Sequence, residues 1–337
     1  MELILAIDAG GTRTRCIAVD RTGRVAGEGL AGASNHLHVP MEVAAAALRS
    51  AATAALTAAG AATDDVVLLS AGLAGVDHDG TGAGDGVAML RSIGVERCVA
   101  HADMVIAHRG ALAGAAGVVA LAGTGSSVLG IAADGTTIKA GGWGPLYGDQ
   151  GSAYQLGRLG LIAAAEAYDR SGPWTALVER LTTALGVSAF PETMTRLYPD
   201  RCGQQHVAAL APAVDACAER GDEVAAGICR QAGADLARAA LAVIRRLPPA
   251  RGARPGADNE GQTAAGSAPP VRVSYQGAVL ARSRLVRDAF LETLRADAPD
   301  IAVSAPRFEP VAGAVLLGAR EAGWRLPLEA LEVLRGV

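Results

Sequence analysis

Two aspartates stand where a carboxylate could take part in phosphate chemistry. Asp8 closes an apolar run and is followed at once by a Gly-Gly-Thr turn, and Asp103 ends a strand-like segment that precedes a helical one. A carboxylate beside a phosphate-binding turn can hold a hydrated Mg²⁺ ion that bridges nucleotide phosphates. A carboxylate at a strand end can also accept the proton of a hydroxyl group. The structural alternatives are an Asp8 that serves the turn and an Asp103 that caps the following helix.

Two glycine-rich turns of matching design lie about 110 residues apart. Leu3 to Val19 reads LILAIDAGGTRTRCIAV, and Gly117 to Ile131 reads GVVALAGTGSSVLGI. In each stretch an apolar strand enters the turn and a second strand leaves it. Such a turn lets backbone N–H groups close around a phosphate, although a single one mostly just reverses the chain. The matching pair predicts a duplicated domain whose two turns face one ligand.

Three further residues could contact a small polar ligand. Asn35 lies in a polar loop, where it could equally serve a turn. Asp149, in Gly148-Asp149-Gln150-Gly151, suits hydrogen bonding to sugar hydroxyls, with an Asx turn as the alternative. Trp143 is flanked by glycines and could face a sugar ring or pack between domains. His101 and His108 lack the spacing of metal ligands, and we expect them to be structural.

The elements that must position these residues follow from hydrophobic pattern and turn signals. The first part of the chain reads as three strands, a helix, a strand, a helix, a strand and a helix, which is an α/β unit of the ribonuclease-H type. The expected strands are 2–8, Cys16 to Val19, a third from Val25, Val66 to Leu69 and Arg97 to Ala100, and the expected helices are 41–59, 83–93 and 104–113.

The second unit begins at the Gly117 hairpin. A helix should run through Ala167, and helical patterns continue to Leu247. Residues 248–270 are rich in Pro, Gly, Ala and Ser, which predicts a flexible surface insertion. A strand from Val271 to Tyr275, a helix opened by Gly277 to Leu280, and a closing helix with Gly313 to Arg320 as its N-terminal half complete the unit.

We therefore expect an α/β protein of two ribonuclease-H-like, actin- or sugar-kinase-like domains that flank an active-site cleft. The domains should comprise residues 1–113 and 114–337, with the closing helix near the domain seam. The 337 residues are enough for two full cores. Because aromatic residues make up only 3% of a chain that is 50% hydrophobic, those cores must consist of Ala, Val and Leu.

Charge and cysteine usage exclude several classes of protein. The net charge of −4 argues against a nucleic-acid partner, and the basic cluster Arg245, Arg246, Arg251 and Arg254 reads as a solvated loop edge. The five scattered cysteines form no C-x-x-C pair, as expected for reduced thiols in a cytosolic protein. Acidic residues interrupt the first apolar run, which excludes a signal peptide. A glycine turn inside the uncharged stretch from Gly110 to Ala133 excludes a membrane span there.

A set of short stretches matches one known family in order and across most of the chain. The stretches are Asp8-Ala9-Gly10-Gly11-Thr12, Ser34-Asn35-His36, Asp103, Gly123-Thr124-Gly125-Ser126, Gly141-Gly142-Trp143-Gly144 and Gly148-Asp149-Gln150-Gly151-Ser152-Ala153-Tyr154. The chain thereby resembles the N-acetylglucosamine kinase branch of the BadF/BadG/BcrA/BcrD ATPase family, within the sugar kinase/Hsp70/actin superfamily. The last two stretches are the specific part of this resemblance.

The resemblance implies a role for each matching residue. Asp103 would be the catalytic base, while Asp8 is the expected metal ligand. Gln150 stands where the family usually has Glu, which leaves the exact sugar open. The sugar would be bound by Asn35, Ser126, Ser127, Gly142, Trp143, Gly144 and Asp149, and ATP by Gly10, Gly11, Thr12, Gly123, Thr124, Gly125, Ala208, Gly277 and Ala278.

We accordingly expect a cytoplasmic, homodimeric kinase that uses ATP and Mg²⁺ to phosphorylate the 6-hydroxyl of N-acetylglucosamine. Glucosamine and N-acetylmuramic acid are the alternative substrates. A non-catalytic sugar-responsive regulator is disfavoured by the intact Asp103. An ATPase subunit coupled to electron transfer is disfavoured because no cysteine follows either turn where it could hold an iron–sulfur cluster. The partner is thus a small amino sugar, with no nucleic acid and no membrane.

Overall fold

The computed structural model describes residues 1–37, 39–198, 203–248 and 269–335. Most of the expected insertion at 248–270 lies outside these residues, as do Cys202, Arg251 and Arg254. The chain forms two compact units, each built on a five-stranded sheet with helices, which confirms the expected α/β class. Unit 1 contains residues 1–119, 131–137 and 304–337, and unit 2 contains residues 120–130 and 138–303.

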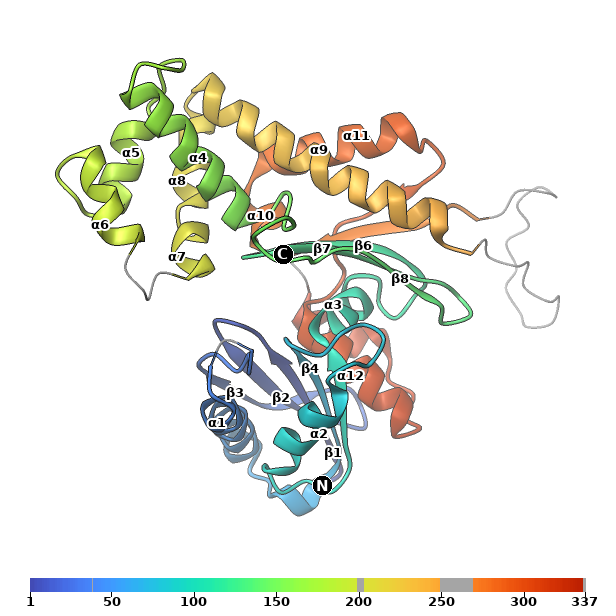
Figure 1. Cartoon of the computed structure of the whole chain (residues 1–337). Helices are drawn as coiled ribbons and strands as arrows, with labels where there is room; N and C mark the ends of the chain where they lie inside the picture. The colour runs from blue at the N-terminus through green and yellow to red at the C-terminus, as the bar shows by residue number, and fades with distance from the viewer. Residues whose placement is uncertain (38, 199–202, 249–268, 336–337) are drawn as a thin grey trace. The chain divides into compact units, whose positions relative to one another are not determined.

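The sheet of unit 1 has the strand order β3-β2-β1-β4-β5 (Figure 1). Strand β1 pairs antiparallel with β2 and parallel with β4, and β4 pairs parallel with β5. The carboxyl ends of β1, β4 and β5 therefore meet at one edge of the sheet. The strands are β1 (Leu3–Ala9), β2 (Thr14–Asp20), β3 (Val25–Ala31), β4 (Val66–Leu73) and β5 (Cys98–Ala102).

Helices cover both faces of this sheet, so its central strand β1 is buried on both sides. Along β1, Leu5 and Ile7 pack in the cluster that contains helix α1 (Met41–Ala59), whereas Ala6 packs in the cluster that contains α12 (Pro310–Glu321). Small residues allow close contact: a Cβ atom on Gly29 of β3 would lie 2.1 Å from the carbonyl oxygen of Ala51 in α1. The remaining helices of the unit are α2 (Ala83–Arg91) and α3 (Asp103–Ala111).

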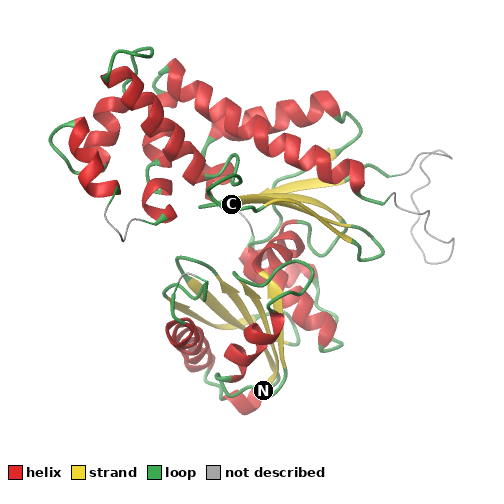
Figure 2. Ribbon diagram, in the orientation of Figure 1, coloured by secondary structure: helices red, strands yellow, loops and turns green. Residues whose placement is uncertain are grey.

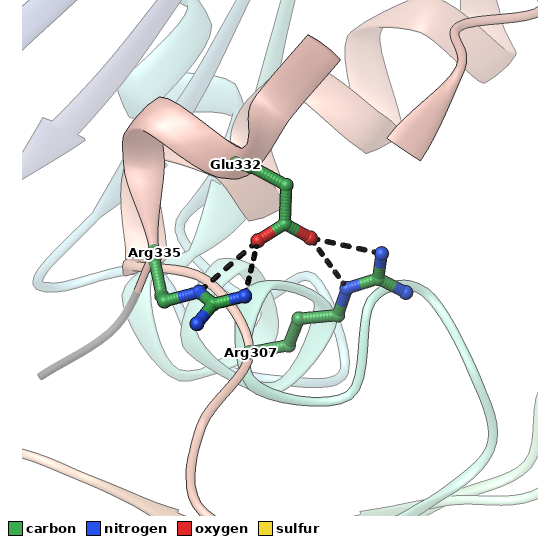
Figure 3. A network of polar contacts seen from close by, with 3 residues as sticks. All are labelled: Arg307, Glu332 and Arg335. Carbon is green, nitrogen blue, oxygen red and sulfur yellow. Dashed lines mark hydrogen bonds and ion pairs between the residues drawn. The ribbon is translucent and has the colours of Figure 1, made fainter. Parts of the chain in front are cut away.

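The C-terminal segment 304–335 belongs to unit 1, although the sequence suggested that residues 114–337 form the second domain. Helix α12 packs against α3 so closely that a Cβ on Gly313 would lie 1.8 Å from the Ile106 carbonyl oxygen. Glu332 in the 3₁₀ segment η3 (Leu328–Leu334) accepts hydrogen bonds from Arg307 at 3.0 Å and Arg335 at 2.9 Å (Figure 3). Helix α12 begins at Pro310, so the expectation that 313–320 is only its first half was wrong.

The sheet of unit 2 repeats the strand order of the first. Its order is β10-β9-β6-β7-β8. Read from the β8 edge, β8, β7 and β6 correspond to β3, β2 and β1 of unit 1, and the later strands β9 and β10 correspond to β4 and β5. This correspondence supports the duplication that the two turns suggested. The strands are β6 (Gly117–Ala122), β7 (Ser126–Ile131), β8 (Thr137–Gly141), β9 (Arg272–Gln276) and β10 (Ala302–Val303).

Unit 2 carries most of the helices (Figure 2). The long helix α9 packs directly on α11, where a Cβ on Gly233 would lie 2.2 Å from the Val286 carbonyl oxygen. None of the helices among the described residues is long and apolar enough to cross a membrane. The helices are α4 (Ala153–Tyr168), α5 (Leu177–Ala184), α6 (Thr193–Leu197), α7 (Gln204–Ala208), α8 (Ala211–Glu219), α9 (Glu223–Arg246), α10 (Ala278–Arg282) and α11 (Arg284–Asp297), with a 3₁₀ turn η2 (Phe190–Glu192).

Candidate functional site

The two aspartates singled out by the sequence lie at the same edge of the unit 1 sheet. In the register of the sheet, Asp8 of β1 is paired with Gly72 of β4, and Gly72 is paired with His101 of β5. Asp103 follows β5 and is the first residue of α3. Ala102 occupies the N-cap position, so Asp103 is not the capping residue. Its carboxylate does accept the Met104 N–H at 2.6 Å, which fixes its orientation at the start of the helix.

The two carboxylates influence each other electrostatically. The pKa of Asp8 is raised to about 6, chiefly by burial and then by the negative charge of Asp103, whereas the positive charges of Arg13 and Arg15 lower it. The Arg15 guanidinium is already paired with Glu28 at 2.8 Å and with Glu309. A buried carboxylate with a second carboxylate nearby is suited to bind a divalent cation. In the part of the chain that the structure describes, no group of three or more His, Cys, Asp or Glu side chains is placed to hold a metal ion.

The first glycine turn connects β1 to β2 beside Asp8. The Gly10 N–H donates to the Arg13 carbonyl at 3.0 Å, while Gly11 and Thr12 are exposed. The Ser34 N–H donates to the Gly10 carbonyl at 3.1 Å, which ties the polar loop to the turn. Asn35, next in the loop, is only 9% exposed and accepts the Leu37 N–H at 3.0 Å. Asn35 therefore does serve a turn, and it does so beside the first phosphate-turn candidate.

The second glycine turn rests on the N-terminus of helix α4 in unit 2. The Ala153 N–H donates to the Gly123 carbonyl at 2.9 Å, and the Tyr154 N–H donates to the Thr124 carbonyl at 3.2 Å. Two of the N–H groups that a helix leaves unsatisfied in its first turn are thus used to hold this loop. Ser152 caps the same helix by accepting the Gln155 N–H at 3.1 Å. Thr124 at the tip is exposed and available to a ligand.

Asp149 is a buried bridge that holds the second turn. Its side chain accepts the Ser126 N–H at 3.1 Å on one oxygen and the Gln204 amide at 2.7 Å on the other. The residue is 4% exposed and has a positive φ of 58°. A Cβ on Gly125 would lie 2.9 Å from the Asp149 carboxylate, so the glycine is required by this contact. The sequence did not indicate Gln204, because a glutamine in a helical run carries no distinguishing signal.

The remaining residues expected to bind ATP in unit 2 lie on elements tied to the same turn. Gly277 has φ 101°, and a Cβ there would lie 2.4 Å from the carbonyl oxygen of Ala122, the residue just before the turn. Ala278, which begins α10, is exposed beside it. Ala208 is buried at the end of α7, the helix whose Gln204 reaches Asp149. The structure thus groups elements that the sequence placed up to about 150 residues apart.

A pocket of about 380 Å³ in unit 2 gathers much of the expected sugar site. It is lined by Ser126, Ser127 and Trp143, whose side chain is 67% exposed. Gly142 and Gly144 flank the tryptophan with φ values of 71° and 78°, a backbone that favours glycine. Gln150, the residue whose departure from the usual Glu left the sugar open, also lines this pocket. The sequence did not indicate five further lining residues: Tyr147, Asp235, Leu236, Arg238 and Ala239.

Comparison with known families agrees with this geometry. The model of the BadF/BadG/BcrA/BcrD ATPase family matches residues 5–318. The chain belongs to this family. Membership confirms the family that the sequence motifs indicated, and it implies the use of ATP. A member of an ATPase family needs phosphate-binding elements, and the two glycine turns supply the candidates.

Three proteins similar to this chain carry names that include N-acetylglucosamine kinase. An N-acetyl-D-glucosamine kinase from Dictyostelium discoideum is 28% identical over 94% of the chain and 97% of its own length. An N-acetylmuramic acid/N-acetylglucosamine kinase from Clostridium acetobutylicum is 26% identical over 73% of the chain and 81% of its own length. The solved structure of a candidate N-acetylglucosamine kinase from Chromobacterium violaceum has a TM-score of 0.74 and 25% identity, covering 94% of this chain and 99% of that one.

Proposed function

We propose that the chain is an ATP-dependent amino-sugar kinase that converts N-acetylglucosamine to its 6-phosphate. The observation that carries the proposal is the Asp8–Asp103 pair at one sheet edge, because it offers a metal ligand and a proton acceptor side by side. The full-length similarity to an N-acetyl-D-glucosamine kinase supports the substrate.

Asp103 is the proposed base. A primary hydroxyl is a weak nucleophile and must lose its proton as the phosphoryl group arrives, and a carboxylate can both orient the hydroxyl and accept that proton. The hydrogen bond from the Met104 N–H orients the Asp103 carboxylate at the start of α3. Asp8 would hold Mg²⁺, which neutralises phosphate charge when bound. The Gly10-Gly11-Thr12 and Gly123-Thr124-Gly125 turns, with Ala208, Gly277 and Ala278, are the proposed contacts to ATP.

The proposed sugar site is the pocket that contains Trp143. Asn35, in unit 1, stays a proposed sugar contact because the family resemblance implies it. The exposed indole can lie against the apolar face of a pyranose ring, and Ser126 and Ser127 can hydrogen-bond its hydroxyls. Asp149, expected to bind the sugar directly, has both oxygens engaged within the protein. We therefore propose that it supports the sugar site by fixing Ser126.

N-Acetylmuramic acid is a second candidate substrate because of Arg238. This guanidinium lines the same pocket and pairs with Asp235, which also accepts a hydrogen bond from Gln231 at 2.8 Å. An arginine has five N–H donors, so the pair leaves several for the lactyl carboxylate of an acidic sugar. A relative whose name includes N-acetylmuramic acid supports this candidate. Glucosamine has no lactyl carboxylate, so it would gain nothing from Arg238.

A coupled ADP-release assay with N-acetylglucosamine, N-acetylmuramic acid, glucosamine and glucose tests the proposal. We expect kcat/KM to be highest for N-acetylglucosamine. If N-acetylmuramic acid is also a substrate, Arg238→Ala should raise its KM and leave that of N-acetylglucosamine nearly unchanged. ADP release that is the same with every sugar and without any would contradict the kinase assignment.

A further inference from the structure

Unit 2 contains a second pocket, of about 420 Å³, between helices α5 and α8. It shares no lining residue with the pocket around Trp143. Ala176, Arg180 and Thr183 line one wall with the spacing of a single helix face, and Arg220 and Gly221 follow the end of α8 on the other. Neither the proposed kinase reaction nor the family motifs use these residues.

Two guanidinium groups reach this pocket. Burial raises the pKa of the Cys217 thiol in the pocket wall, and Asp222 raises it further, while the positive charges of Arg180 and Arg220 both oppose this rise. Both guanidinium groups therefore affect the electrostatics of the same pocket wall, at Cys217. Neither forms an ion pair with any residue in the part of the chain that the structure describes. Two arginines without a carboxylate partner at one pocket are suited to bidentate binding of a phosphate group.

Two acidic residues, Asp222 and Glu179, also line the pocket. Asp222 accepts hydrogen bonds from the Thr175 hydroxyl at 2.8 Å, the Ala176 N–H at 2.6 Å and the Ala225 N–H at 2.9 Å. Burial raises the pKa of Asp222, but these hydrogen bonds outweigh burial and lower it, so its carboxylate is already stabilised by the protein. Glu179 remains exposed at the rim and can accept hydrogen bonds from a ligand.

The rim also carries Trp174, whose side chain is 82% exposed. The indole of Trp174 thus leaves a large apolar surface in water at the rim of the pocket, where a bound ligand could cover it. Indole rings bind the apolar C–H face of a sugar ring, and carboxylates accept hydrogen bonds from sugar hydroxyls. The pocket thus combines contacts for a phosphate, a ring face and hydroxyl groups.

We propose that this pocket is a binding site for a phosphorylated sugar, separate from the pocket around Trp143. Arg180 and Arg220 bind the phosphate, Trp174 covers the ring, and Glu179 accepts hydrogen bonds from the hydroxyls. The proposed kinase reaction yields a compound of this class, so the site would allow the product to bind away from the residues that carry out the reaction. The ligand class itself follows from the pocket and does not depend on that reaction.

Tryptophan fluorescence tests the proposal in a Trp143→Phe background, which removes the reporter of the first pocket. N-Acetylglucosamine 6-phosphate should cause a saturable change, and inorganic phosphate, free N-acetylglucosamine and AMP should each bind at least about tenfold more weakly, the equivalent of about 1.4 kcal/mol. The change should disappear when Trp174→Phe is added. Arg180→Ala with Arg220→Ala should weaken binding by at least about tenfold, whereas Arg196→Ala on α6, outside the pocket, should not.

Three outcomes would overturn the site. One is no saturable response to the sugar phosphate, the second is a response that survives loss of both arginines, and the third is tighter binding of AMP, which would indicate a nucleotide. The titration contains no ATP and measures no turnover. A failed sugar panel in the ADP-release assay and a failed titration are therefore separate results.

Discussion

At the scale of single residues, the proposed chemistry depends on Asp103. Asp103→Asn keeps the size of the side chain but cannot accept a proton, so kcat should fall by roughly 10² to 10⁴ while the affinities for sugar and ATP change little. Steady-state kinetics combined with sugar binding measured by calorimetry checks this. Retention of more than about a tenth of wild-type kcat would show that Asp103 is not the base and that its bond to Met104 is its main role.

Asp8 should make stability depend on pH in a defined window. Its pKa is about 6 in the folded protein against 3.8 for the unperturbed group. The folded state therefore binds more protons than the unfolded state between these values, and stability falls as pH rises through this window and stays lower above pH 6. Asp8→Asn removes the buried charge and should stabilise the metal-free, nucleotide-free protein above pH 6 by up to about 3 kcal/mol, with little effect near pH 4.

Urea unfolding at pH 4.5 and 7.5 would measure this difference. Asp20→Asn is the matched control with the opposite sign: burial raises the pKa of Asp20, but hydrogen bonds from Thr22 and Arg24 outweigh burial and lower it. That variant should destabilise the protein at neutral pH. An Asp8→Asn variant that is less stable than the wild type at pH 7.5 would refute the electrostatic argument.

At the scale of elements, the second turn depends on Gly277. Gly277→Ala combines a positive φ of 101° with a Cβ placed 2.4 Å from the Ala122 carbonyl oxygen, so it should cost about 2 kcal/mol or more and raise the KM for ATP. Gly227→Ala in α9, where a Cβ would meet nothing within 4 Å, should instead stabilise by about 0.5–1 kcal/mol. Denaturant midpoints that shift in the same direction for both variants would argue against this.

Asp149 connects the same turn to helix α7. Asp149→Ala leaves the buried Ser126 N–H without its acceptor and releases Gln204, so we expect a loss of about 1–3 kcal/mol together with higher KM values for both substrates. Gln204→Ala breaks only the second bond and should have the smaller effect on both measurements. Unchanged stability with a higher KM for the sugar alone would instead favour direct sugar binding by Asp149.

At the scale of the whole molecule, the proposed reaction draws on residues of both units. Asp8, Asn35 and Asp103 belong to unit 1, whereas Thr124 and Trp143 belong to unit 2. Because the elements proposed to bind the hydroxyl differ from those proposed to bind the phosphates, ADP release should be slow without sugar. It should rise sharply when bound sugar excludes water from the reacting phosphate. The coupled assay at saturating ATP, with and without N-acetylglucosamine, measures this ratio. A ratio near one would contradict the prediction.

Hydrophobic pattern alone predicted most of the unit 1 elements. Helix α1 has the expected bounds of 41–59, because an Ala-rich run ends at Gly60, whose positive φ of 63° suits glycine. Strands β8 and β10 were missed, since a short mixed run such as Thr137–Gly141 and a two-residue strand carry no periodic signal. Such strands exist because neighbouring strands supply their hydrogen-bond partners.

The sequence by itself determined the local chemistry of this protein: two strand-ending aspartates, two glycine turns and an α/β class set by apolar periodicity. These are properties of short stretches, which propensity and pattern govern. Only the tertiary structure decided that Asp149 is buried between Ser126 and Gln204, that Arg238 joins Trp143 in one pocket, and that residues 304–335 complete unit 1. Each of these contacts joins segments far apart in the chain, and only the packing of the folded units brings them together.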